Sequence, residues 1–313
     1  MMTARSIIID TDPGHDDAVA ILVALASPEL AVRGITTVAG NVPLALTTRN
    51  ARRVLALAGR EDVPLFAGCG RPLLRPLVTA EAVHGQTGLD GAELPEPTVP
   101  LSDRHAVDWL VDTLLAARDD PVTLCPLGPL TNIAMALVRE PRIADGIAQV
   151  VLMGGAAFAG GNTTPAAEFN IYVDPHAADI VFRSGLPLTM LPLDCTHKAL
   201  MQADWIEGLG RLGTRVGQAV SALLRFYQRY DVAKYGSSGG PLHDPTVIAY
   251  LLQPQLFAGK TCNVRVEVGS PLTLGMTVTD WWGVTGEPAN CTVITEVDAA
   301  GFFALVADRL GRL

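Results

Sequence analysis

Short, wholly apolar runs alternate with helical patterns over the first two thirds of the chain. Residues 7–9 are three isoleucines in a row, and an apolar helical segment follows at residues 16–27. Strand-like runs and amphipathic helical segments then alternate along residues 31–40, 45–59, 63–68, 105–118, 122–128, 129–140, 147–155 and 186–194. Strands without a polar face belong in a parallel sheet that helices cover on both faces. The pattern predicts a Rossmann-like α/β fold with a mostly parallel central sheet flanked by helices.

The last third of the chain follows a different pattern. Residues 200–260 have a mostly helical pattern, and strands are expected from residue 263 onward, before a final helix. No internal repeat, low-complexity stretch or charged linker divides the 313 residues. We therefore expect a single domain over residues 1–313, in which a helical region and a short C-terminal strand region accompany the parallel sheet.

Composition narrows the possible partners and the compartment. With 49% hydrophobic and 18% charged residues, the chain can bury a large core. A formal net charge of −9, with no cluster of Lys or Arg, argues against binding to nucleic acid. Five scattered cysteines without a CxxC pair predict reduced thiols in a soluble, cytoplasmic protein. Neither a signal peptide nor a stretch of about 18 apolar residues is visible, so no membrane association is expected.

Four aspartates within eight positions follow the isoleucine run directly: Asp10, Asp12, Asp16 and Asp17. Like charges this close disfavour one another's ionisation, and burial increases the penalty. A bound cation, a substrate rich in hydroxyl groups or exposure to water would relieve it. A simpler explanation is a solvated turn in which one carboxylate caps a helix. Because oxygen ligands from short side chains suit hard cations, the loop is a candidate site for calcium or magnesium.

A second interpretation of this loop is the phosphotransferase loop of haloacid dehalogenases, where D-x-D also follows an apolar strand. In that loop the first Asp is a nucleophile, and Thr or Val normally stands two places after the second Asp. Here Gly14 occupies that place, and no Lys lies in an obviously matching motif. The departure weakens this alternative, which nevertheless stays open.

Polar motifs also follow other strand-like runs, where ligands of doubly wound sheets bind. They are V-A-G-N at residues 38–41, G-P-L-T-N at residues 128–132 and M-G-G at residues 153–155, followed by N-T-T-P-A-A-E-F-N at residues 162–170 and H-D-P at residues 243–245. Each is unremarkable alone, and a single His-Asp pair is more often structural than catalytic. Together with D-T-D-P-G-H-D-D, in this order, the set resembles the nucleoside hydrolase family of the inosine-uridine preferring type.

The resemblance implies a calcium ion at the bottom of a pocket and hydrolysis of the N-glycosidic bond of ribonucleosides. The products would be ribose and free base, in nucleoside salvage or catabolism. By match to the motifs, the calcium ligands would be Asp12, Asp17, Asp244 and the backbone carbonyl of Leu127. The ribose 2′- and 3′-hydroxyls would be bound by Asp16, Asn41 and Asn170. Asn162 and Glu168 would lie near the 5′-hydroxyl, and Asp10 would support the loop from behind.

The expected chemistry follows from these residue types. Asp12 can accept a proton from water that the metal activates, and surrounding carboxylates stabilise a transition state resembling an oxocarbenium ion. His243 is the candidate proton donor to the leaving base, and His84 is a candidate to assist it. Three tyrosines could stack on the base: Tyr227, Tyr230 and Tyr235.

Relatives in this family are dimers or tetramers, so a homodimer or homotetramer is expected. The main alternative function is a non-catalytic, calcium-dependent protein that binds ribose or nucleosides. Base preference does not follow from these motifs, because the loops at that end of the pocket match least well.

Overall fold

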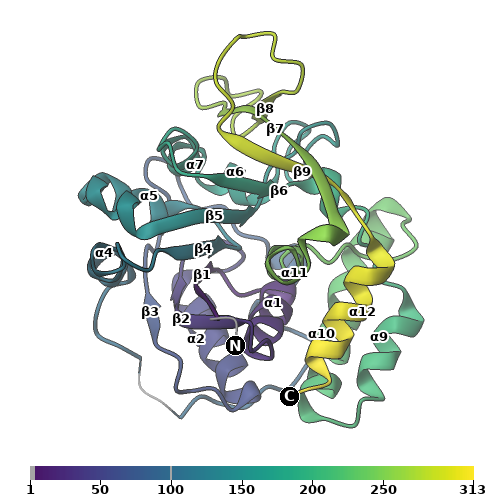
Figure 1. Cartoon of the computed structure of the whole chain (residues 1–313). Helices are drawn as coiled ribbons and strands as arrows, with labels where there is room; N and C mark the ends of the chain where they lie inside the picture. The colour runs from purple at the N-terminus through teal and green to yellow at the C-terminus, as the bar shows by residue number, and fades with distance from the viewer. Residues whose placement is uncertain (1–3, 99–100) are drawn as a thin grey trace.

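A central nine-stranded sheet organises the molecule in the computed structural model, which describes residues 4–98 and 101–313 (Figure 1). The strand order is β3-β2-β1-β4-β5-β6-β9-β7-β8. Seven strands run parallel: β1 (Arg5–Thr11), β2 (Leu30–Thr37), β3 (Leu65–Ala67), β4 (Val122–Pro126), β5 (Ile147–Met153), β6 (Leu188–Leu191) and β9 (Cys291–Val297). Two strands at one edge are antiparallel to their neighbours: β7 (Phe257–Val266) and β8 (Thr277–Asp280). The predicted α/β class with a mostly parallel sheet is confirmed.

Both faces of the sheet are covered by helices, which explains the absence of a polar face on strand β1. Ile7 and Ile9 belong to one buried cluster and Ile8 to a second cluster on the opposite face. Helices α4 (Ala106–Ala116), α5 (Thr131–Arg139) and α7 (Pro175–Phe182) cover the face of Ile8 (Figure 1). The face of Ile7 packs against α1 (His15–Leu25), α2 (Leu44–Ala58), α10 (Arg215–Tyr235), α11 (Pro245–Leu252) and α12 (Ala299–Leu310). A strand between two helical layers has no side left for polar residues.

Short helices fill the remaining connections: α3 (Glu81–His84), α6 (Phe169–Val173), α8 (Leu193–Thr196) and α9 (Ala203–Gly210), with 3-10 turns at Pro141–Gly146 and Pro254–Leu256. Within the described ranges, no helix is long and apolar enough to cross a membrane.

The C-terminal strands begin earlier than the sequence predicts. Strand β7 starts at Phe257 and not at residue 263, because its first half pairs with β9 from Phe257 opposite Val297 to Cys262 opposite Cys291. The intervening residues 258–261 are exposed and show no alternation of polar and apolar side chains. Pairing with β9 therefore decides the start of β7, and no local hydrophobic pattern marks it.

The parallel arrangement gathers the polar motifs at one edge of the sheet. In the sheet, strands β2, β1, β4 and β5 lie side by side in this order, and each runs parallel to its neighbour. Their carboxyl ends therefore lie side by side, and the loops that leave them meet there. The start of α11 reaches the same region, since α11 packs against α1.

Candidate active site

A sharp turn joins β1 to α1 and carries the first acidic residues. Gly14 precedes the helix, and a Cβ on this residue would collide with the ring of His84 and with the side-chain amide of Asn41. The turn therefore needs glycine for close packing, and its φ of −99° requires no left-handed conformation. It brings Asp16 and Asp17 to the first turn of α1, where carboxylates are favoured by the helix dipole.

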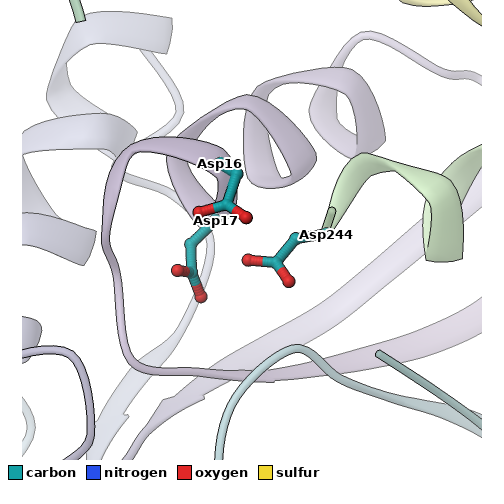
Figure 2. Close-up of side chains that lie close together, drawn as sticks. All are labelled: Asp16, Asp17 and Asp244. Atoms are coloured by element: carbon teal, nitrogen blue, oxygen red, sulfur yellow. The ribbon is translucent and has the colours of Figure 1, made fainter. Parts of the chain in front are cut away.

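Asp16, Asp17 and Asp244 converge in one buried group. Each offers a carboxylate oxygen, and these oxygens lie within 4.8 Å of one another. Figure 2 shows that Asp16 and Asp17 come from the start of α1, whereas Asp244 comes from the residue before α11. Two of the three aspartates that the motif match suggests as metal ligands, Asp17 and Asp244, therefore lie together, with Asp16 as the third member of the group.

Asp12 lies beside this group and is not one of its three members. Its Oδ2 accepts a hydrogen bond from the backbone N–H of Asn41 at 2.7 Å. Its Oδ1 is buried and has no hydrogen-bond partner among the described residues. The side-chain amide of Asn41 donates to the Asp12 carbonyl and to Asp17 Oδ2, both at 3.2 Å. A buried carboxylate oxygen without a partner is costly, so this atom is suited to a ligand.

Burial makes this acidic end of the site unfavourable for charge. It raises the pKa of Asp16 to about 7, with the charge of Asp17 adding to the effect. The pKa of Asp12 is raised well above its usual range by burial and by the charge of Asp17, and that of Asp244 by burial and by the charges of Asp16 and Asp17. Four carboxylates with only oxygen donors fit a hard divalent cation, which would offset both the burial and the repulsion.

Asp10 supports the turn without contacting the group directly. Its Oδ1 accepts from Thr36 Oγ1 at 2.5 Å and from Asn132 Nδ2 at 2.7 Å. Asn132 also donates to the Thr37 carbonyl at 3.0 Å. Asp10 thus ties the ends of β1 and β2 to the start of α5, and burial raises its pKa to about 7.

A cavity of about 190 Å³ opens beside the acidic group. It collects most of the residues singled out from the sequence: Asp16, Asn41, His84, Leu127, Asn162, Glu168, Asn170, Tyr227, Tyr230, His243 and Asp244. Asp12 and Asp17 are completely buried behind this lining. No Lys or Arg belongs to the cavity lining in the part of the chain that the structure describes. The side chain of Tyr235 lies outside the described residues.

One wall of the cavity is built from the loop before α6. Both oxygens of Glu168 accept backbone hydrogen bonds, Oε1 from Asn170 and Oε2 from Gly155, each at 2.9 Å. Burial raises the pKa of Glu168 to about 7. Asn170 Nδ2 donates to the Leu127 carbonyl at 2.7 Å, and Asn162 Oδ1 accepts from the Phe169 N–H at 3.0 Å.

Three histidines line another part of the cavity: His84, His197 and His243. His243 Nδ1 lies 2.7 Å from Thr196 Oγ1, and its ring centroid is 5.9 Å from that of His197. Burial lowers the pKa of His243 to about 3 and lowers the pKa of His84 well below its usual range. Tyr227 stacks on His84 with ring centroids 5.4 Å apart and directs its hydroxyl to Asp16 Oδ2 at 3.4 Å. Burial therefore favours the neutral form of the His84 and His243 imidazoles.

Sequence reasoning missed several residues around the cavity. His197 and Asp231 line it, Thr196 contacts His243, and His15 contacts His84 from behind. The only feature of the sequence that could have indicated a role for His15 is its position inside the acidic motif D-T-D-P-G-H-D-D. The partners of Thr196 and His15 lie 47 and 69 positions away, so no local pattern marks them.

Residues 7–304 match the family described as inosine-uridine preferring nucleoside hydrolase. The chain belongs to this family. It is 50% identical over 308 residues to the pyrimidine-specific ribonucleoside hydrolase RihA of Photobacterium profundum, covering 98% of this chain and 99% of that protein. The structure of a purine-preferring ribonucleoside hydrolase from Gardnerella vaginalis superimposes with a TM-score of 0.91 at 33% identity, with 98% of each chain covered. The plant nucleoside hydrolase PpNRh1 gives 0.89 at 34% identity, covering 98% of this nucleoside hydrolase and 99% of that chain.

The predicted family, fold and enzyme class are therefore confirmed. This nucleoside hydrolase is a ribonucleoside N-glycosidase, so the phosphatase interpretation of the acidic loop and the non-catalytic alternative are set aside.

Proposed function

We propose that this nucleoside hydrolase depends on calcium and cleaves ribonucleosides, with a preference for pyrimidine bases, to ribose and free base. The carrying observation is the buried group of Asp16, Asp17 and Asp244 beside a cavity without a cationic side chain in its described lining. A bound cation would offset that much buried like charge. The all-oxygen set favours calcium, which accepts carboxylates and carbonyls in flexible numbers.

The proposed calcium ligands are Asp12, Asp17, Asp244 and the carbonyl of Leu127. Bound calcium would lower the pKa of a water molecule and position it. Asp12 would accept the proton of the attacking water as general base, for which its unpartnered Oδ1 is available. A cation would also return the pKa of Asp12 toward its ordinary range, so that its carboxylate is ionised before the reaction.

The sugar would be held by the cavity wall that contains Glu168 and Asn170, by Asn41 and by Asp16 at the start of α1. Asp16, Asn41 and Asn170 are proposed to bind the ribose 2′- and 3′-hydroxyls, and Asn162 and Glu168 to lie near the 5′-hydroxyl. All five line the cavity. Carboxylate and amide oxygens around the sugar stabilise the positive charge that develops on the ribose ring in the transition state.

The leaving base would receive a proton from His243, with His84 at the same end of the cavity. Thr196 Oγ1 at 2.7 Å from His243 Nδ1 can donate or accept, so it supports the ring both before and after proton transfer. Tyr227 and Tyr230 are the described tyrosines available to contact the base.

Support for a pyrimidine preference comes from the relatives. Proteins named pyrimidine-specific ribonucleoside hydrolase match over 98% of this chain at 48% to 50% identity. The purine-preferring enzyme from Gardnerella vaginalis matches at 33%. A role in nucleoside salvage and a homodimeric or homotetrameric state stay predictions from the family resemblance, and a cytoplasmic location stays a prediction from the cysteine pattern.

Ribose release from a panel of uridine, cytidine, inosine and adenosine tests the proposal, with calcium, with a chelator and with magnesium. We expect calcium-dependent release, fastest from uridine or cytidine. Equal release in metal-free protein, verified by elemental analysis, would refute calcium dependence, and faster release from inosine would refute the pyrimidine preference. p-Nitrophenyl phosphate with magnesium serves as the control for phosphatase activity and should stay intact.

A further inference from the structure

Residues 155–159 follow strand β5 and lead to the cavity wall that contains Glu168. Residues 158–160 are exposed, and the ring of Phe158, at 62% exposure, reaches that of Trp281 edge-on with centroids 5.3 Å apart. Because this part of the chain buries little apolar surface, we expect hydrogen bonds more than packing to fix its position.

Asp194, in the short helix α8, accepts hydrogen bonds from three consecutive backbone N–H groups of this segment. Its Oδ2 accepts from Ala157 at 2.7 Å, and its Oδ1 accepts from Phe158 at 2.8 Å and from Ala159 at 3.1 Å. Hydrogen bonds to a carboxylate are stronger than those between neutral groups. A single side chain thus holds three successive peptide groups.

Thr277, in the edge strand β8, holds the preceding residue of the segment. Its Oγ1 accepts from the Ala156 N–H at 2.8 Å and donates to the Ala156 carbonyl at 2.7 Å. The side chain of Thr277 is 1% exposed, and a Cβ on Gly155 would lie only 2.9 Å from its Oγ1. One buried hydroxyl therefore satisfies both backbone groups of Ala156.

Gly155 connects this segment to the cavity. Its carbonyl accepts from the N–H of Leu193, in α8, at 2.9 Å, and its own N–H donates to Glu168 Oε2 at 2.9 Å. Glu168 also accepts from the N–H groups of Asn170 and Ile171, but these belong to its own helix α6. The hydrogen bond from Gly155 therefore ties the Glu168 carboxylate to the segment that α8 and β8 hold.

We propose that Asp194 and Thr277 are positioning residues that fix residues 155–159 and thereby hold the Glu168 carboxylate where it binds the 5′-hydroxyl of the nucleoside. The inference rests on the proposed placement of Glu168 against that hydroxyl. Neither Asp194 nor Thr277 belongs to the cavity lining within the described ranges, so both act through Gly155. The edge strand β8 therefore takes part in recognition of the sugar.

Hydrogen exchange in calcium-loaded protein tests this arrangement without any substrate. Asp194→Ala removes the acceptor of three amides, so the amides of residues 157–159 should exchange faster, while those of helix α1 keep their wild-type rates. Unchanged exchange at residues 157–159 would overturn the proposal, whatever the enzyme hydrolyses.

The best nucleoside substrate and its 5′-deoxy analogue test the link to Glu168. Asp194→Ala should lower kcat/KM for the nucleoside about tenfold, the order expected for one lost hydrogen bond to the 5′-hydroxyl, and scarcely change kcat/KM for the analogue. Thr277→Val keeps the shape of the side chain and removes the hydroxyl, and it should produce the same selective loss. The exposed Asp119→Ala is the control and should keep both values.

Equal losses on the two substrates in Asp194→Ala and Thr277→Val would indicate a general structural role and overturn the proposal. So would wild-type kcat/KM for the nucleoside in both variants. Equal kcat/KM for the two substrates in wild-type protein would refute the placement of Glu168 and overturn the proposal with it. If wild-type protein released no ribose from any nucleoside, the proposed function would fail, while hydrogen exchange would still decide whether Asp194 holds residues 157–159.

Discussion

The acidic end and the histidine end of one cavity respond to burial in opposite directions. At the acidic end, burial raises the pKa values of Asp12, Asp16 and Asp244. At the histidine end, it lowers the pKa values of His84 and His243. Loss of water thus favours the neutral form of every group, acid or base.

The two ends differ in what they need in order to work. Neutral imidazoles can already donate and accept hydrogen bonds, but His243 must also take up a proton before it can protonate the leaving base. Neutral carboxylic acids cannot serve as general base or cation ligands, so the acidic end needs a cation to become ionised. The comparison predicts that the acidic end is essential for every substrate, whereas the histidine end matters according to the leaving group.

Removing Asp17 should have the largest effect. Asp17→Ala deletes a proposed calcium ligand and the hydrogen-bond acceptor of Thr11, Gly14 and Asn41. We expect the variant to lose its bound calcium and more than about 100-fold in kcat/KM. This loss is larger than the loss that removal of a hydrogen-bond partner of a ligand causes. Elemental analysis and ribose release measure both. Exposed Asp119→Ala is the control and should retain metal and activity. Retained activity in metal-free Asp17→Ala would contradict the conclusion that the acidic end needs a cation.

His243 sharpens the comparison by its dependence on the leaving group. His243→Ala should slow hydrolysis of a natural nucleoside by about 10²–10⁴-fold, the usual contribution of a general acid. The same variant should scarcely affect p-nitrophenyl riboside, whose phenolate leaves without a proton. Asp12→Ala should abolish hydrolysis of both substrates.

A purely structural His243 predicts another result. Its ring is held beside Thr196 and between two prolines, so His243→Ala would then lose both activities equally and melt at a lower temperature. Equal losses on the two substrates would assign His243 to structure and remove it from the chemistry.

Substrate charge tests the wall near Glu168. A nucleoside 5′-monophosphate would bring its phosphate near Glu168 with no Lys or Arg in the described cavity lining to pair with it. Repulsion in a partly dry pocket is worth several kcal/mol, so kcat/KM should be about 100-fold lower than for the nucleoside. Glu168→Gln should reduce the difference in kcat/KM between the nucleoside and its 5′-monophosphate. Comparable values for both substrates in the wild-type protein would contradict the placement of the 5′-hydroxyl.

The smallest expected effect is the pH dependence of stability in metal-free protein. Folding raises the pKa values of Asp10, Asp16 and Glu168 to about 7, so the folded chain binds more protons than the unfolded chain up to that pH. The free energy of unfolding therefore falls as the pH rises from about 6.5 to about 8. Histidines whose pKa is lowered by folding have the opposite effect on the free energy of unfolding, which they raise as the pH rises. This effect is small above about pH 6.5, because histidines in the unfolded chain have mostly lost their protons there.

Thermal melting across this range should show a decrease of about 2–4 °C per kcal/mol lost. Added calcium should reduce the slope, because the cation keeps Asp16 and its neighbours ionised. A melting temperature that rises over the same range in metal-free protein would contradict the burial of these carboxyl groups in neutral form.

The sequence was sufficient for the parts of the molecule that local patterns encode. Three consecutive isoleucines predict a strand buried on both faces, and Ile7 and Ile8 indeed pack into different clusters. Asp16 and Glu168, from motifs that follow strands β1 and β5, line one cavity because parallel strands end at the same edge.

Features that depend on long-range contacts were not predictable. The start of β7 is set by pairing with β9, and its first residues carry no hydrophobic alternation. His15 acquires its contacts from His84 and Asp90, which lie 69 and 75 positions away. Asp16 has a carboxylate oxygen within 4.8 Å of those of Asp17 and Asp244, a proximity that residue spacing does not encode.

The position of Asp244 gives the acidic group a mechanical consequence. Asp16 and Asp17 begin the first helix of the fold, and Asp244 immediately precedes α11, close to the antiparallel edge strands in the chain. A cation shared by these carboxylates would act as a cross-link that closes a loop spanning most of the polypeptide, and closure of a long loop removes much chain entropy from the unfolded state. Without the cation this constraint is lost, so amide hydrogens in the first turns of both helices should exchange together once the ion is removed.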